Sequence, residues 1–167
     1  NGELVALSGT LESVDRSVLI SPFSQQECVY YSYNISHTEV KTDRTRYIDT
    51  HRGIHYPPLL LKTDHGDFTL QGTLNIERFK LNKFSYKDKE SQVKEYFSKN
   101  PPERLNQLTL FDKDINESKV ARDYTNGNEI TKTSILEEIY IKPKQQVVII
   151  SNYDPGSSNL ELNSESR

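Results

Sequence analysis

The chain contains no methionine, no tryptophan and a single cysteine, Cys28, among its 167 residues. One cysteine cannot form an internal disulfide, and it excludes zinc modules such as a RING, which need several thiolates. The apolar fraction is only 34%, so the ten tyrosines and six phenylalanines must supply much of the core volume. This length and composition predict one domain with a sizeable core, rich in β-strands and with a solvated sheet face.

Long runs of positive charge are also missing, because no four basic residues are consecutive and the formal net charge is -3. Domains that bind nucleic acid concentrate basic residues on one face, so we expect no nucleic-acid partner. An OB-type binder of single strands stays open as an alternative, because distant basic residues can gather in space. Its stacking platforms would be Tyr30, Tyr47 and Tyr56.

Apolar runs are short, the longest being residues 59–61 and 147–150. A helix needs about 20 apolar residues to span a bilayer, and no signal-peptide pattern is visible. The chain starts at Asn1 and has no methionine. We therefore expect it to be a piece of a longer protein, with any membrane segments in the flanking parts.

Alternation of apolar and polar residues is clearest after Cys28. Val29, Tyr31, Tyr33 and Ile35 share one face of an extended chain, and polar side chains take the other face. This period of two predicts a long strand with one buried face, as in an antiparallel sheet. Other strands are expected at residues 4–13, 59–62, 67–71, 133–142 and 146–151.

The middle of the chain has a helical period instead. Val93, Tyr96 and Phe97 are spaced as on one helix face within residues 90–99, and Pro101 ends that segment. A second short helix is expected at residues 102–111, and residues 41–58 are interpreted as an irregular hairpin tip. The fold class is therefore α+β, mainly antiparallel β, with a small helical insertion at about residues 85–125.

Residues 18–33, VLISPFSQQECVYYSY, are interpreted as a strand, a tight loop around Pro22 and a second strand. SPFSQQECVYYSY resembles the "SPFSG…CVYY" signature of the GIDE domain, also called the beside-a-membrane (BAM) domain. That domain occurs in mitochondrial membrane-anchored ubiquitin ligases and in prokaryotic relatives. Residues 2–14, 60–74 and 136–151 resemble its opening strand, hairpin and closing strand pair, in the family's order. Gln25 departs from the family's usual glycine, and residues 79–128 match no part of the pattern.

The resemblance implies an OB-like, partly closed barrel over residues 1–153, followed by a flexible tail or linker at 154–167. It also implies that the domain is membrane-anchored through flanking segments and lies on the non-cytosolic side. The ligase activity of the eukaryotic members belongs to a separate RING, which this chain lacks. We therefore expect a domain without catalytic activity or cofactor that binds a protein partner or senses a ligand.

The loop formed by Ser21, Pro22, Phe23 and Ser24 is the candidate binding site. Phe23 is an apolar residue in a turn that should be exposed, and such residues often anchor partners. The alternative is that Phe23 folds back over the end of the barrel as a plug, and we favour the plug.

Cys28, Glu137 and Glu138 are candidates for catalysis by residue type. A nucleophilic thiol needs a base and an electropositive setting, whereas Cys28 begins an apolar strand, so a core position is favoured. Neighbouring residues of a strand point to opposite faces, so the two glutamates cannot act together. One of them is expected to make a structural hydrogen bond.

His51, His55 and His65 are weak candidates for a metal site, with Asp49, Asp64 or Asp67 as carboxylate ligands. The spacing of His51 and His55 would align them on a helix, but Gly53 and the prolines at 57 and 58 argue against one. Exposed loop histidines are the favoured interpretation. A metal-dependent hydrolase built on these loops is the second alternative function.

Overall fold

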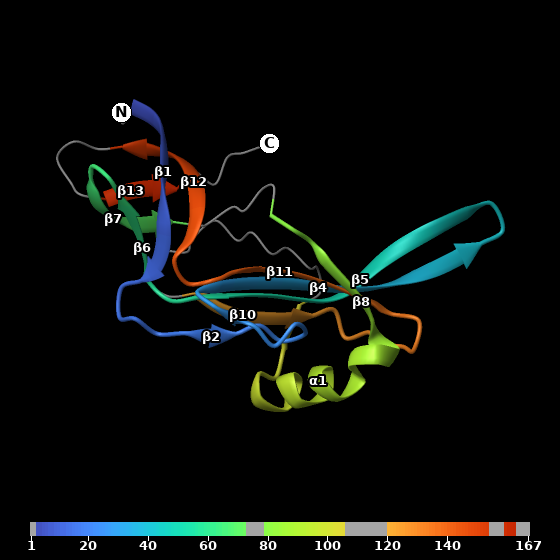
Figure 1. Ribbon diagram of the computed structural model, residues 1–167. Helices are drawn as coiled ribbons and strands as arrows, with labels where there is room; N and C mark the ends of the chain where they lie inside the picture. Colours follow the sequence, from blue (N-terminus) through green and yellow to red (C-terminus); the bar gives the residue numbers. More distant parts are fainter. Residues whose placement is uncertain (1–2, 73–78, 106–119, 154–158, 163–167) are drawn as a thin grey trace.

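The computed structural model describes residues 3–72, 79–105, 120–153 and 159–162. Within them the chain forms mainly antiparallel strands and one helix, α1 (Tyr86–Lys99), which confirms the α+β, mainly antiparallel β class (Figure 1). The strands are β1 (Glu3–Ser13), β2 (Leu19–Ile20), β3 (Glu27–Cys28), β4 (Tyr30–Lys41), β5 (Arg44–Tyr56), β6 (Leu59–Thr63), β7 (Gly66–Gly72), β8 (Asn82–Ser85), β9 (Glu103–Arg104), β10 (Val120–Thr125), β11 (Ile135–Ile141), β12 (Gln145–Tyr153) and β13 (Asn159–Leu162).

Five strands pair in a closed ring, in the order β1, β12, β13, β7, β6 and back to β1. All neighbours are antiparallel except β13 and β7, which are parallel. Gly9 allows β1 to cross close to β6, because a Cβ there would lie 2.2 Å from the carbonyl oxygen of Lys62. The expected hairpin at residues 59–71 is confirmed as β6 and β7.

The end of the chain differs from the expected tail. Residues 159–162 form β13, which pairs with both β12 and β7 and completes the ring. A segment that closes a ring of strands is structural, so the prediction of a flexible tail is wrong for these four residues. Residues 154–158 and 163–167 lie outside the described part.

A second sheet has six strands in the order β8, β11, β4, β5, β10, β9. Helix α1 lies against one face of this sheet (Figure 1). The long strand after Cys28 is confirmed as β4, with Tyr31, Tyr33 and Ile35 buried in one cluster. Val29 lies before β4 and packs in a different cluster, so the prediction that it shares their face is wrong. The barrel that the resemblance implies over residues 1–153 would include this strand, but β4 lies in the six-stranded sheet and takes no part in the ring.

The insertion expected at 85–125 is only partly helical. Helix α1 confirms the helical period of residues 90–99 and begins four residues earlier, after Ser85. The prediction of a second helix is wrong at Glu103 and Arg104, which form β9, and its remainder from residue 106 lies outside the described part. β10 then joins the sheet beside β5 and pairs with β9, so the segment adds a helix and two strands at one end of the sheet.

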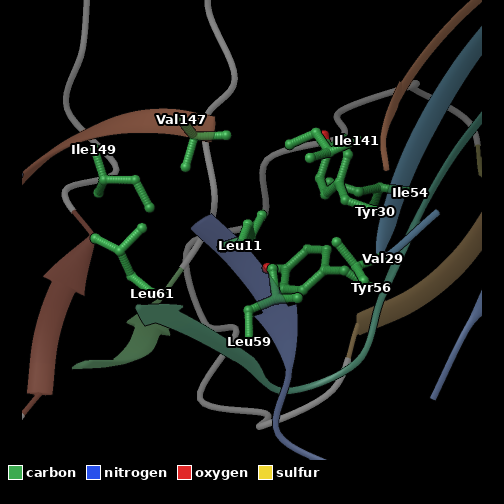
Figure 2. Packing of buried hydrophobic residues seen from close by; sticks show 10 residues of the cluster. All are labelled: Leu11, Val29, Tyr30, Ile54, Tyr56, Leu59, Leu61, Ile141, Val147 and Ile149. Carbon is green, nitrogen blue, oxygen red and sulfur yellow. The ribbon is translucent and has the colours of Figure 1, made fainter. Parts of the chain in front are cut away.

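One hydrophobic cluster fills the space between the ring and the adjoining end of the six-stranded sheet. Leucine, isoleucine and valine predominate, and two tyrosines complete it. Figure 2 shows side chains from the ring strands and from the sheet strands pointing toward one another. The buried members are Leu11, Val29, Tyr30, Ile54, Tyr56, Leu59, Leu61, Ile141, Val147 and Ile149.

A second cluster lies between the six-stranded sheet and α1. It differs in composition because most of its side chains are aromatic, and several carry hydroxyl groups. The buried members are Phe23, Cys28, Tyr31, Tyr33, Ile35, Tyr86, Val93, Tyr96 and Leu136.

β4 and β5 form a hairpin that extends past the rest of the sheet (Figure 1). Residues 41–58 are therefore mostly strand, where an irregular tip was expected. The register shifts between Ile35 and Ser36, because Ile35 pairs with His51 and Ser36 pairs with Asp49. Thr50 is thus the extra residue of a β-bulge, a feature that bends and re-aims the strands beyond it.

Candidate functional site

The Ser-Pro-Phe-Ser loop is held by the carboxylate of Glu138 on β11. The backbone N–H of Phe23 donates to Oε1 at 2.9 Å, and the backbone N–H of Ser24 donates to Oε2 at 2.8 Å. The hydroxyl of Ser24 also donates to Oε2. Glu138 has no exposed surface, so these three donors replace water around a buried charge.

This loop is not an exposed recognition surface. Ser21 and Phe23 have no exposed surface, and Pro22 is also buried. Phe23 packs edge-on against Tyr33, with ring centroids 5.5 Å apart. Ser24 is only half-buried, but its donors are used by Glu138. Phe23 therefore fills the interior, as the plug interpretation expects, although it packs in the second cluster and not at the end of the ring.

Gln25 adopts the left-handed backbone region, with φ at 55°. That region favours glycine and costs other residues about 1–2 kcal/mol. The side-chain amide of Gln25 offsets part of this cost, because its Nε2 donates to the carbonyl oxygen of Pro22 at 2.8 Å.

Cys28 and Glu137 take no part in a reactive arrangement. Cys28 is fully buried, and burial raises the pKa of its thiol to about 12, with the nearby Glu138 charge as a further cause. The thiol therefore stays protonated near neutral pH and fills space. Glu137 and Glu138 point to opposite faces of β11, as expected, and Glu138 is the one with the structural hydrogen bonds.

Among the described residues, an extended group of hydrogen-bonded side chains lies where α1 meets β4, β5 and β10. Its centre is Asp123, whose Oδ1 accepts from the hydroxyls of Tyr33 at 2.5 Å and Tyr96 at 2.7 Å. Oδ2 lies 2.7 Å from Nε2 of His55. Tyr31 completes the group, since its hydroxyl lies 3.0 Å from that of Tyr96. We call these five residues the tyrosine–aspartate cluster.

Counting protons assigns the direction of each bond. Tyr96 gives its only hydroxyl proton to Asp123, so Tyr31 must donate to Tyr96. His55 then donates Nε2–H to the Asp123 carboxylate. Burial raises the pKa of all three tyrosines, and the charge of Asp123 raises each further. The hydroxyls therefore remain protonated donors.

This cluster is closed to solvent. Tyr31, Tyr33, His55 and Tyr96 each have 9% or less of their surface exposed, and the Asp123 side chain has 8%. A Cβ on Gly53 would lie 2.2 Å from the ring of Tyr33, so the ring lies directly across the β5 backbone. The arrangement can hold α1 on the sheet, and it presents no open position for a substrate.

The three candidate histidines do not converge. His65 is exposed in the turn between β6 and β7, whereas His51 and His55 are buried on β5. The interpretation of His51 and His55 as exposed loop residues is therefore wrong. Within the described part of the chain, no three histidine, cysteine, aspartate or glutamate side chains are placed to hold a metal ion.

His51 is a buried, neutral side chain. Burial lowers its pKa from 6.5 to about 4, and its ring packs against Phe97 with centroids 5.1 Å apart. Its Nδ1 lies 3.0 Å from the hydroxyl of Thr50, which itself donates to the carbonyl oxygen of Ile35. Nδ1 must therefore carry the proton and donate to Thr50.

The three tyrosines proposed as stacking platforms are not on one surface. Tyr30 and Tyr56 are buried and stack on each other with centroids 5.6 Å apart. Tyr47 is 69% exposed on the distal part of the hairpin. A groove lined by all three is therefore excluded.

Asp123 and Tyr96 are the central residues of the tyrosine–aspartate cluster, and the sequence did not predict that they are in contact. Tyr96 was assigned to a helix face, but Asp123 lies in a polar segment without a periodic pattern. The hydrogen bond between them joins residues 27 positions apart, and a pattern of local spacing cannot predict a contact at that separation.

Comparison of this chain with protein-family models, with curated proteins and with solved structures found no match in any of the three. In the described ranges, no helix combines the length and the apolar character needed to cross a membrane.

Proposed function

We propose that this chain is a non-catalytic docking domain of the GIDE, or beside-a-membrane, type, with an OB-like barrel at one end. In this proposal, flanking segments of a longer protein anchor it at a membrane on the non-cytosolic side, and it binds a protein partner. The observation that carries the proposal is the contact between Glu138 and the Ser-Pro-Phe-Ser loop. It joins the block that most resembles the family, at residues 21–33, to residue 138 of the block at 136–151.

The other blocks also meet in space. β1 pairs with β12 and with β6, so one strand from each of the blocks at residues 2–14, 60–74 and 136–151 lies in the ring, whereas β11 of the last block lies in the six-stranded sheet. Gln25 stands near the family's usual glycine and has the positive φ that glycine favours. The five-stranded ring, with strands distant in sequence beside each other, is consistent with an OB-like barrel.

The polar chemistry of the interior favours docking over catalysis. Asp123 accepts three hydrogen bonds and Glu138 accepts three, and all the donors belong to this chain. These carboxylates stabilise the positions of a helix and a loop.

Expression of the full-length protein tests the proposal. We expect it to remain in membranes after alkaline carbonate extraction, and we expect protease to cleave this domain in sealed vesicles only after detergent is added. Affinity capture from the solubilised membranes should enrich a protein in stoichiometric amount. Release by carbonate, stoichiometric zinc in the purified protein, or substrate turnover by the isolated domain would each contradict it.

A further inference from the structure

The distal part of the β4–β5 hairpin, residues 37–48, extends beyond the strands that flank β4 and β5 in the sheet. We call it the arm. β11 pairs with β4 only as far as Ser36, and β10 pairs with β5 only from His51 onward. Beyond these points the two strands pair with each other, and in the described chain neither has another strand beside it. An isolated two-stranded hairpin is marginally stable in water.

The two faces of the arm differ in chemistry. Lys41, Arg44 and Arg46 share one face with Glu39, because Glu39 pairs with Arg46 and Lys41 pairs with Arg44. The opposite face carries Val40 and Tyr47, which are 81% and 69% exposed. These two side chains are diagonal neighbours across the strands. The arm therefore has a cationic face and a partly apolar face.

The cationic side chains have little compensation. The ion pair of Arg44 with Asp43 measures 3.8 Å between side chains that are both 76% exposed, and such pairs contribute little. In the part of the chain that the structure describes, Lys41 and Arg46 have no ion pair. Three cations against one carboxylate on this face attract a negatively charged ligand.

The root of the arm is held firmly. The carboxylate of Asp49 binds Arg52 and accepts from the Asn34 side-chain amide at 2.9 Å. The side chain of Asn126 donates to the backbone carbonyl of Asp49 at 2.8 Å, next to the bulge at Thr50. A ligand therefore meets strands whose direction is already fixed, which lowers the entropy cost of binding.

We propose that the arm binds an acidic polypeptide in extended conformation, which pairs as an additional strand along the free edge of β5. Alternate residues of such a strand reach alternate faces. A segment that alternates acidic and apolar residues would meet Arg44 and Arg46 on one face and Tyr47 on the other. The edge of β4 is the poorer one, because it carries Glu39. This inference rests on the proposed docking function and names its surface and partner chemistry.

A protein ligand is favoured over a nucleic acid. A free strand edge offers backbone N–H and C=O groups, which match another polypeptide.

The direct test uses a fluorescein-labelled decapeptide that alternates glutamate and valine, titrated with this chain and followed by fluorescence anisotropy. The variant Arg44→Glu/Arg46→Glu should weaken binding by about tenfold or more, because attraction becomes repulsion. The matched control, Lys87→Glu/Lys142→Glu, makes the same charge change at exposed positions on α1 and after β11. It should leave affinity within about twofold. Circular dichroism and the thermal midpoint verify that both variants are folded.

Three results would overturn the inference: equal binding of a lysine–valine decapeptide, equal losses in both variants, or preferred binding of a 20-nucleotide single strand. The same variants placed in the full-length protein separate this inference from the proposed function. Loss of the captured partner in the arm variant alone supports both. If the arm variant still captures the partner, the partner binds another surface and the inference about the arm is wrong. If no membrane partner is captured at all, the proposed function itself is contradicted.

Discussion

The two hydrophobic clusters of this protein both pack other parts of the fold against the six-stranded sheet, but their side chains differ in chemistry. The cluster of Figure 2, between the ring and the sheet, is mostly aliphatic and includes Leu11, Leu61 and Ile149. The cluster under α1 combines aromatic rings with buried carboxylates at Asp123 and Glu138. Aliphatic packing tolerates approximate contacts, whereas buried charges require all their donors in position. The polar cluster should therefore depend on the exact positions of its donors, and the aliphatic one should not. The region under α1 also contains His51, whose pKa burial lowers to about 4, so its stability should depend on pH.

The largest effect is expected from Glu138→Ala. The substitution leaves the backbone N–H groups of Phe23 and Ser24 without an acceptor, and each unsatisfied buried donor costs about 1–3 kcal/mol. We expect the free energy of unfolding to fall by about 4 kcal/mol in total, measured by urea denaturation. Glu137→Ala is the control on the opposite face of β11, and a loss as large there would contradict this role for Glu138.

Leu61→Ala tests the aliphatic cluster. Leu61 has no exposed surface, so the cavity should cost about 3 kcal/mol. The loss should be the same at every pH from about 4 to 8, because the cluster's aliphatic side chains carry no titrating group in this range. Leu4→Ala, at a site 64% exposed, should change stability by less than about 0.5 kcal/mol. If the loss of unfolding free energy in Leu61→Ala varied strongly with pH, the proposed difference between the two clusters would be contradicted.

Acid should weaken the region of α1 through His51. Its pKa is lowered from 6.5 to about 4 by burial, so the unfolded chain binds more protons between these values. The stabilising contribution is complete above pH 6.5 and is lost as pH falls toward 4, by at most about 3 kcal/mol. His51→Phe removes the titration and should flatten this part of the stability profile. An unchanged slope in that variant would contradict a neutral, buried His51.

Tyr96→Phe should have the smallest effect of the four. It removes the hydroxyl that donates to Asp123 and accepts from Tyr31, while the ring stays in place. We expect a loss of about 1–2 kcal/mol, measured by thermal and urea denaturation. Tyr47→Phe, on the exposed arm, should be neutral. Equal effects of both substitutions would indicate that the tyrosine–aspartate cluster contributes nothing beyond packing.

Local patterns predicted the elements that have a strong period. The alternation from Tyr31 to Ile35 and the helical spacing of Val93, Tyr96 and Phe97 predicted β4 and the core of α1 correctly. The patterns did not predict which strands pair, because one buried face looks the same in a ring and in an open sheet. The barrel expected over residues 1–153 would include β4, which instead lies in the six-stranded sheet.

Residues whose role depends on a distant partner were missed. Gly53 suggested a loop at His51 and His55, yet it lies in β5 because the ring of Tyr33 covers it from the neighbouring strand. Residues 159–162 gave only a short alternation within a polar stretch, and their strand character depends on β12 and β7. Glu138 was recognised as one of two candidates for a structural hydrogen bond, but its donors on a loop more than 100 residues away were not foreseen.

The pairing of β1 with β12 has a consequence for synthesis of the chain. Glu3 pairs with Tyr153, so ribosomes adding about 5–20 residues per second complete the intervening chain only after roughly 8–30 s. During this interval β1 lacks its main hydrogen-bonding neighbour, and Val5, Leu7 and Leu11 have no finished cluster to enter. Until β12 emerges, a nascent chain therefore exposes an unpaired strand and apolar side chains, the features that make incompletely folded chains prone to aggregation.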